Sequence, residues 1–280
     1  MKPCISQATI LNSPYDADPT ILARAGWTSV EIWLTKLETY LEGSTVREAG
    51  ELFREAGVEL AAASAQGGLL LSRGPEQAAH WNHYKRRLEI LAELEVPILI
   101  VAADPVRETE TADFPRAAAA LAEAAALAEP YGVRLALEFQ KRSGICSCLE
   151  TAAALVAQAG AGNLGVCLDV FHYYTGPSKF DDLAYLTPQT LAWTQISDMS
   201  GVPREIAGDA DRILPGEGDF QISPILRHLE RMGYQGGVSL EILNPKLWQV
   251  AADRVADLGR RALDRALAAA QPAGALRGDA

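Results

Sequence analysis

The fold class of this chain is decided by three consecutive segments: PILIVAA at residues 97–103, TETADFPRAAAALAEAAALAE at 109–129 and VRLALEF at 133–139. The first and third are apolar runs short enough to be strands, and the middle one is rich in the strong helix formers Ala, Leu and Glu. A strand that returns parallel to its neighbour needs a crossover, usually a helix. These segments therefore predict a βαβ unit.

The same strand-then-helix alternation extends along the whole chain. Helical composition recurs at 75–94 and at 245–270. Strands are expected at CISQATI (4–10), TSVEIW (28–33), ELAAAS (59–64), PILIVAA (97–103), VRLALEF (133–139), LGVCLDV (164–170), LAWTQIS (191–197) and GVSLEI (237–242). Their starts lie roughly 33 residues apart, which suits a strand, a helix and two short connections. We predict an α/β fold, a single (β/α)8 TIM barrel over residues 1–270, with a flexible C-terminal tail at 271–280.

The composition counts against several classes of protein. Hydrophobic residues make up 49% of the 280, which indicates a chain that buries a sizeable core. The formal net charge of −11 repels phosphate backbones and anionic lipid. The four cysteines lack paired CxxC spacing, and neither a signal peptide nor an apolar run long enough to span a membrane is recognisable. We expect a cytoplasmic protein without nucleic-acid or membrane partners.

Metal-capable side chains stand where four late strands end. They are Glu138 in LALEFQ, Asp169 in LDVFHYY, Gln195 in WTQISD and Glu241 in VSLEILNP. The carboxyl ends of barrel strands converge on one face, where TIM-barrel active sites form. A carboxylate buried there needs a cation, hydrogen-bond donors or water. An ion pair with Lys or Arg explains any one of them equally well, whereas a shared divalent metal would satisfy them together.

Other residues near the strand ends are candidates for holding substrate oxygens. His172 follows Asp169 by three residues, and Arg212 precedes a PGEG turn in a long polar loop over 200–219. The alternatives are a loop histidine packed on the adjacent tyrosines and a surface ion pair of Arg212 with a neighbouring aspartate. The early strand ends supply polar and aromatic groups for an opposite wall, namely Asn12, Glu31, Trp33, Ser64, Gln66 and Asp104.

The remaining histidines and cysteines are interpreted as structural. His80 and His83 have the i,i+3 spacing of helical metal ligands, but they stand in the middle of a helix expected on the outer ring of the barrel. His228 is expected on a helix surface for the same reason. Cys146 and Cys148 have no second cysteine pair, so a metal site is not predicted there.

Five motifs together resemble the sugar phosphate isomerase/epimerase superfamily, the xylose isomerase-like TIM barrels. They are VEIW (30–33), LALEFQ (135–140), LDVFHYY (168–174), RILPGEG (212–218) and GYQGGVSLEI (233–242). The resemblance covers nearly the whole chain, and the motifs are specific for the superfamily rather than for one substrate. The combination of DVFHYY with the RILPGEG loop is most similar to the inosose (2-keto-myo-inositol) isomerase branch.

The resemblance implies a divalent ion held by Glu138, Asp169, Gln195 and Glu241. Gln195 departs from the family, whose members commonly have His at this position. A neutral amide oxygen is a harder and weaker ligand than imidazole, so Mn²⁺ or Mg²⁺ is favoured over Co²⁺ or Zn²⁺. By the same resemblance Glu138 and Glu241 form the acid/base pair, and His172 and Arg212 hold substrate oxygens. From their place at the early strand ends, Glu31, Trp33 and Gln66 are also expected to bind substrate.

The chemistry that follows is proton abstraction next to a carbonyl with a metal-stabilised ene-diolate. We therefore predict an isomerase or epimerase of a ketose or keto-inositol, that is, of a small polyhydroxylated carbonyl compound. Family members often form homodimers or homotetramers, but no interface is recognisable in the sequence.

Three other functions are compatible with the same barrel. A lyase or dehydratase acting on a keto-sugar, keto-inositol or 3-keto-glycoside would use the same intermediate, and product mass would distinguish it. DNA-repair endonucleases with this barrel need a histidine-rich zinc cluster and a basic face, which four histidines and a net charge of −11 do not suggest. A non-catalytic sugar-binding barrel would follow if Gln195 marked the loss of the metal.

Overall fold

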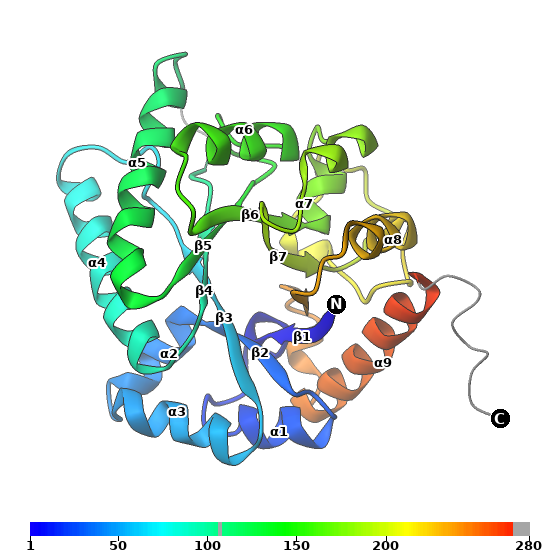
Figure 1. The fold of residues 1–280 in the computed structure, drawn as a ribbon. Helices are drawn as coiled ribbons and strands as arrows, with labels where there is room; N and C mark the ends of the chain where they lie inside the picture. Colours follow the sequence, from blue (N-terminus) through cyan, green and yellow to red (C-terminus); the bar gives the residue numbers. More distant parts are fainter. Residues whose placement is uncertain (106–107, 271–280) are drawn as a thin grey trace.

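Eight parallel strands close into a barrel in the computed structural model, which describes residues 1–105 and 108–270 (Figure 1). The strands are β1 (Lys2–Ser6), β2 (Ser29–Trp33), β3 (Glu59–Gln66), β4 (Ile98–Ala102), β5 (Arg134–Glu138), β6 (Leu164–Asp169), β7 (Leu191–Ile196) and β8 (Gly237–Leu240). Each strand pairs with the next, and β1 also pairs with β8, where Lys2 lies opposite Gly237 and Ile5 opposite Leu240. The prediction of an α/β TIM barrel is confirmed.

Helices surround the barrel and follow the strands along the chain (Figure 1). The α-helices are α1 (Asp18–Arg24), α2 (Leu34–Leu41), α3 (Val46–Glu55), α4 (Gly74–Glu93), α5 (Asp113–Ala128), α6 (Leu149–Ala159), α7 (Val170–Thr175), α8 (Ile222–Met232) and α9 (Ala252–Ala270). Short 3₁₀ helices are η1 (Gln7–Ile10), η2 (Glu129–Tyr131), η3 (Phe180–Tyr185), η4 (Asp209–Asp211) and η5 (Leu247–Gln249).

Three predicted element boundaries differ from the structure by four residues or more. The first strand ends at Ser6, because the Ser6 side chain accepts a hydrogen bond from the Ala8 backbone N–H and starts η1. The helix expected from residue 109 begins at Asp113, whose carboxylate accepts the backbone N–H of Glu110. The helix expected from residue 245 begins at Ala252, after η5. The predicted tail at 271–280 lies outside the described residues.

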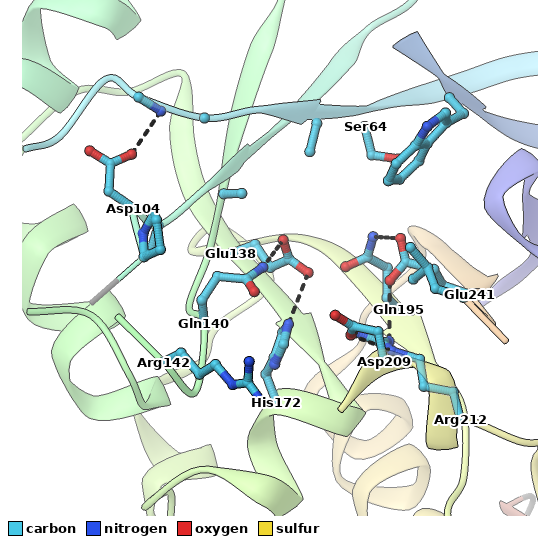
Figure 2. Close-up of a pocket in the computed structure, with 18 residues that line it drawn as sticks. Ser64, Asp104, Glu138, Gln140, Arg142, His172, Gln195, Asp209, Arg212 and Glu241 are labelled. Carbon is cyan, nitrogen blue, oxygen red and sulfur yellow. Dashed lines mark hydrogen bonds and ion pairs between the residues drawn. The ribbon is translucent and has the colours of Figure 1, made fainter. Parts of the chain in front are cut away.

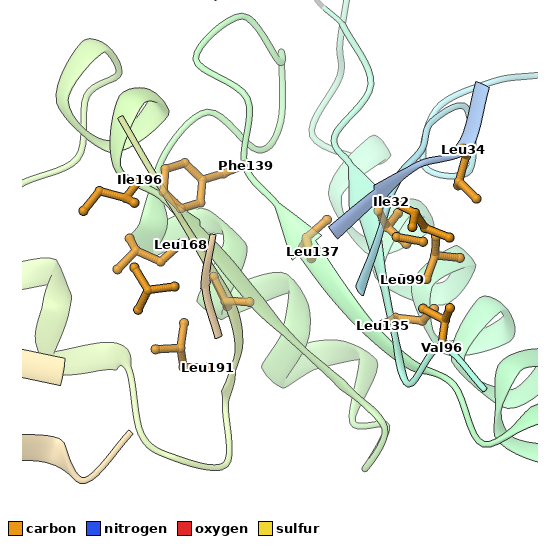
Figure 3. Packing of buried hydrophobic residues seen from close by; sticks show 14 of the residues in the cluster. Ile32, Leu34, Val96, Leu99, Leu135, Leu137, Phe139, Leu168, Leu191 and Ile196 are labelled. Atoms are coloured by element: carbon orange, nitrogen blue, oxygen red, sulfur yellow. The ribbon is translucent and has the colours of Figure 1, made fainter. Parts of the chain in front are cut away.

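The buried side chains form two layers, as the alternation of a strand requires. On β5, Leu135 and Leu137 belong to the large apolar cluster, part of which Figure 3 shows. Ala136 lies between them in sequence and packs in a smaller cluster with Cys4, Ala62, Ile100, Cys167, Ala192 and Trp193, one or two from each of several strands. We assign this smaller cluster of small side chains to the barrel interior, where Trp193 is the largest member.

A structured loop connects β7 to α8 and brings Arg212 to the carboxyl ends of the strands. Asp198 pairs with Ile213 in an antiparallel bridge, and its carboxylate accepts the backbone N–H groups of Met199, Gly216 and Phe220. The Lys141 ammonium donates to two further carbonyls of this loop. These bonds fix the loop over the end of the barrel. No helix in the described part of the chain is long and apolar enough to cross a membrane.

Candidate active site

A cavity of about 360 Å³ opens at the carboxyl ends of the strands, as expected for this fold (Figure 2). Glu138 from β5, His172 from α7, Gln195 from β7 and Glu241 just after β8 all line it. Arg212 reaches it from the β7–α8 loop. Residues that are 17 to 103 positions apart in the sequence are thus brought together because the strand ends converge.

Asp169 and His172 are held on one turn of α7. One carboxylate oxygen of Asp169 accepts the backbone N–H of Phe171 at 2.7 Å and caps the helix. The other oxygen lies 3.7 Å from Nε2 of His172, because residues three apart share a helix face. Burial lowers the pKa of His172 to about 4, although the nearby Asp169 opposes this shift. The imidazole is therefore neutral at pH 7.

Glu138 is a buried carboxylate beside a second one. Gln140 donates to its Oε2 at 2.5 Å, and Nε2 of His172 lies 4.0 Å from its Oε1 (Figure 2). Burial raises the pKa of Glu138 well above its usual range, and repulsion from Asp169 adds to the increase. The raised pKa favours the protonated form of this carboxyl group, which suits Glu138 to a proton-transfer role.

Arg212 is a buried cation that joins carboxylates from the ends of β6 and β8. Its guanidinium contacts Asp169 at 2.8 Å, Glu241 at 3.2 Å and Asp209 at 2.9 Å. It also stacks over the ring of Phe171, 4.4 Å from the centroid. Burial works to lower the pKa of Arg212, but the three carboxylates outweigh it and raise that pKa. Arg212 is thus not the surface residue of the alternative interpretation.

Glu241 combines burial with a close positive charge. Burial raises the pKa of Glu241 well above its usual range; Arg212 opposes the shift, and the carboxylates of Glu31, Glu138 and Asp169 add to it. Its two oxygens accept from different donors, Nη1 of Arg212 and Nε2 of Gln195. Glu241 is therefore firmly oriented as well as able to carry a proton.

Gln195 connects Glu241 to a buried layer below the cavity. Its amide nitrogen donates to Glu241 at 2.9 Å and to Glu31 at 3.0 Å. Glu31 in turn accepts from Ser64 at 2.6 Å and from the indole N–H of Trp193 at 2.7 Å. Glu31 is 0% exposed and does not line the cavity, so the expectation that it contacts substrate is not supported by its position.

The other predicted wall residues divide into two groups. Trp33, Ser64 and Asp104 line the cavity. Gln66 points away from it, because its amide oxygen accepts from Arg87 on α4 and its nitrogen donates to Gly67. This placement corrects the prediction that Gln66 binds substrate.

Asn12 also lies away from the cavity, where it donates to the carbonyl of Trp248. The histidines that were interpreted as structural lie on outer helices. His83 on α4 pairs with Glu38 at 2.6 Å, and His228 lies on α8. Cys146 and Cys148 are buried free thiols.

Three polar or charged residues of the cavity escaped the sequence interpretation: Gln140, Arg142 and Asp209. Gln140 stands two residues after Glu138 in the motif LALEFQ. Its place next to a strand end is the signal from which it could have been predicted. Arg142 and Asp209 belong to loops whose course cannot be inferred from periodicity. Asp209 is one of the aspartates close to Arg212 in the sequence, and it both pairs with Arg212 and lines the cavity.

The residues present fit a divalent cation by charge and by donor type. Four buried carboxylates, Glu31, Glu138, Asp169 and Glu241, lie in or below the site. Among the described residues, the buried cation that pairs with any of them is Arg212, which contacts Asp169 and Glu241, so the formal charge of the group is negative. Potential ligand atoms of Glu138, Asp169 and His172 all lie within 4.8 Å of one another. Carboxylate and imidazole are donors that first-row divalent metals accept.

The sequence is similar to known proteins over most of its length. A family model described as xylose isomerase-like TIM barrel matches residues 19–266. An inosose isomerase from Halalkalibacterium halodurans is 29% identical over 265 residues, covering 90% of this chain and 92% of that protein. A 3-dehydroshikimate dehydratase from Pseudomonas aeruginosa is 27% identical over 230 residues, covering 80% of this chain but 35% of that protein.

Two solved structures have the same fold. The IOLI protein, crystallised with a bound zinc atom, superimposes with a TM-score of 0.91 at 23% identity and covers 96% of this chain and 98% of its own. D-Psicose 3-epimerase from Clostridium cellulolyticum, in complex with D-tagatose, gives a TM-score of 0.78 at 21% identity and covers 97% of this chain and 100% of its own. At these identities the likeness establishes the fold.

Proposed function

Because this chain belongs to the xylose isomerase-like TIM barrel family, we propose that it is a divalent-metal-dependent isomerase or epimerase of a ketose or keto-inositol. The observation that carries the proposal is the pair of buried glutamates, Glu138 and Glu241, at one cavity with the buried guanidinium of Arg212. The match to a relative named inosose isomerase, over 92% of its length, supports a cyclic or open-chain polyol ketone as substrate.

Glu138 and Glu241 are proposed as the acid/base pair. Burial raises both pKa values, and repulsion from neighbouring carboxylates adds to the increase, so both groups are suited to proton transfer. One glutamate takes the proton from the carbon next to the carbonyl, and reprotonation at the neighbouring carbon or on the opposite face gives isomerisation or epimerisation. Gln140 orients Glu138, and Gln195 orients Glu241, through the hydrogen bonds described above.

The developing oxyanion needs positive charge and hydrogen-bond donors. Arg212 supplies a guanidinium at the cavity wall, where its charge is little screened by water. Glu138, Asp169 and Glu241 would hold the divalent ion, which would polarise the substrate carbonyl and acidify the neighbouring C–H. Because oxygen donors predominate, we propose Mn²⁺ or Mg²⁺ ahead of Co²⁺ or Zn²⁺.

The proposal extends to cellular context. Four free cysteines and a net charge of −11 support a cytoplasmic enzyme of a small polar substrate without nucleic-acid or membrane partners. We propose that the protein assembles as a homodimer or homotetramer, because related barrels often do so.

A substrate panel in D₂O tests the reaction. The protein is incubated with Mn²⁺ and with ketoses, inososes and 3-keto-glycosides, and products are analysed by NMR and mass spectrometry. We expect deuterium next to the carbonyl and a product of unchanged composition, in wild type and in the control variant Arg204→Gln from the exposed part of the β7–α8 loop. If no member of the panel incorporates deuterium, the proposed function is wrong.

A lyase or dehydratase is the second candidate. The match to a protein named 3-dehydroshikimate dehydratase favours it, because that similarity covers 80% of this chain. The same proton abstraction followed by loss of a β-hydroxyl or alkoxy group would give elimination. A product lighter by one water, or a released aglycone, would establish this reaction in place of isomerisation.

A further inference from the structure

Both polar ends of the Gln195 side chain are engaged with protein groups. The amide nitrogen faces two carboxylates, Glu31 and Glu241, and carboxylates only accept hydrogen bonds, so this end of the amide is the nitrogen. The amide oxygen accepts from the thiol of Cys167 at 3.2 Å. Gln195 is 0% exposed, and its oxygen is directed at β6 in the barrel wall. These contacts leave the amide oxygen poorly placed as a metal ligand.

His172, in contrast, has a buried ring without a hydrogen-bond partner. The residue is 4% exposed, and Nδ1 is buried with no partner among the described residues. Nε2 lies 4.0 Å from Glu138 (Figure 2) and 3.7 Å from Asp169, beyond hydrogen-bond distance of either. Nε2, the ring nitrogen nearest these carboxylates, therefore makes no hydrogen bond to them, while Nδ1 is the ring nitrogen that stays buried without a partner in the described part of the chain.

The geometry around Nε2 suits a cation. Nε2 points between two carboxylates that come from different strands, and the three ligand atoms lie within 4.8 Å of one another. Gaps of 3.7 and 4.0 Å are too long for direct hydrogen bonds and are of the size that a shared central ion bridges, since metal–oxygen and metal–nitrogen bonds are near 2.1 Å. The imidazole is also fixed on α7 by the cap that Asp169 provides.

We propose that His172, rather than Gln195, supplies the nitrogen ligand of the divalent ion, and that Gln195 is a positioning residue that holds Glu241. This inference rests on the proposed function only in placing a divalent ion in this cavity. It reassigns His172 from substrate to metal, and it explains how a glutamine is accommodated on β7 without losing a ligand from the site.

Metal binding, measured without substrate, tests the proposal. Chelator-treated wild type, His172→Gln, Gln195→Met and the control His228→Gln are titrated with Co²⁺ and, after loading with Mn²⁺, are studied by pulsed EPR for coupling to a histidine nitrogen. We expect wild type to bind one ion with one such coupling. His172→Gln is expected to lose the coupling and to bind the ion at least about tenfold more weakly. Loss of a residue that merely supports a metal ligand already costs about 10–100-fold in affinity, so loss of a ligand should cost no less. Gln195→Met and His228→Gln keep the coupling.

The positioning role has its own readout. Gln195→Met is expected to lower kcat for deuterium exchange with little change in KM, because Glu241 loses a donor while the ion stays bound. Circular dichroism checks that each variant is folded, and His172→Asn replaces His172→Gln if the latter is not. A histidine coupling that persists in both His172 variants, or one that is lost in Gln195→Met, overturns the assignment. Metal binding as expected without any deuterium exchange would instead contradict the proposed function.

Discussion

Arg212 and Asp169 form an ion pair of 2.8 Å in which both side chains are almost completely buried. A second nitrogen of the same guanidinium contacts Glu241 at 3.2 Å. One side chain from a loop thus ties the ends of β6 and β8 together across the site. The site consequently depends on a residue that no strand carries.

Removing the charge of Arg212 should damage both stability and catalysis. Arg212→Met leaves two buried carboxylates without their cation, a change that typically costs about 3–5 kcal/mol. Arg212→Lys keeps the charge but cannot contact both carboxylates as a fork does. We expect the free energy of unfolding in urea to be highest for wild type, lower for Arg212→Lys and lowest for Arg212→Met. Arg204→Gln should be as stable as wild type. Equal stability of all four proteins would show that the buried pair is energetically unimportant.

Glu241→Gln should slow proton transfer strongly and leave the fold intact. The amide has nearly the same shape but cannot accept the substrate proton, and a positioned acid/base group contributes typically about 10²–10⁴-fold. The rate of solvent deuterium incorporation, measured by NMR at saturating Mn²⁺, should fall by that factor. Glu217→Gln, on the exposed PGEG turn, serves as the matched control. Exchange at the wild-type rate in Glu241→Gln would exclude it as the base.

The barrel was predictable because each strand is a short apolar run followed by a helix-forming segment. The position of Glu138, Asp169, Gln195 and Glu241 at one face follows from the same periodicity, since all stand at the ends of converging strands. Side-chain direction was not predictable. Whether Gln66 faces the cavity or Arg87 depends on the packing of α4.

The contacts that loop residues make could not be predicted from the sequence either. The contacts of Arg212 depend on the course of the β7–α8 loop, which Asp198 fixes through three backbone N–H groups. The direction of the Gln195 amide depends on Glu31, a residue from the opposite side of the barrel. Such tertiary contacts have no periodic signature.

The pH dependence of the free energy of unfolding should show the contribution of the Asp113 carboxylate. Its carboxylate accepts the backbone N–H of Glu110 and pairs with Arg116 and Arg73, and these contacts lower its pKa to about 2. A depressed pKa in the folded state means that the stabilisation is fully present above the ordinary value of 3.8 and is lost as the pH falls towards 2. The stability difference between wild type and Asp113→Asn should therefore shrink between pH 4 and pH 2. A difference that is constant with pH would contradict this origin.

A second buried ion pair supports the wall of the cavity. Lys36 contacts Asp18 at 2.5 Å, and Gln7 donates to Asp18 while its oxygen accepts the backbone N–H of Trp33. Lys36→Met should destabilise the protein by about 3 kcal/mol or more, because it leaves a buried carboxylate unpaired. Adding Asp18→Asn should recover part of that loss, as a double-mutant cycle would measure. Simple additivity of the two changes would mean that the residues are not coupled.

Gly237 is the position where β8 leaves room for Trp193. A Cβ at Gly237 would lie 2.3 Å from Cη2 of Trp193, a buried side chain whose indole N–H donates to Glu31. Gly237→Ala must displace either the strand or the indole, and overpacking of this kind typically costs about 1–3 kcal/mol. Gly162→Ala is the matched control, because a Cβ there meets nothing within 4 Å.

A second substitution can show whether the cost of Gly237→Ala arises from its contact with Trp193. Trp193→Phe shortens the ring, so Gly237→Ala should cost less in the Trp193→Phe background than in wild type, as measured by urea unfolding. Because the displaced indole carries a hydrogen bond to Glu31, and Glu31 holds Gln195, the single variant Gly237→Ala should also slow deuterium exchange. A cost of Gly237→Ala that is the same in both backgrounds would place the strain in the β1–β8 closure instead, where Gly237 lies opposite Lys2.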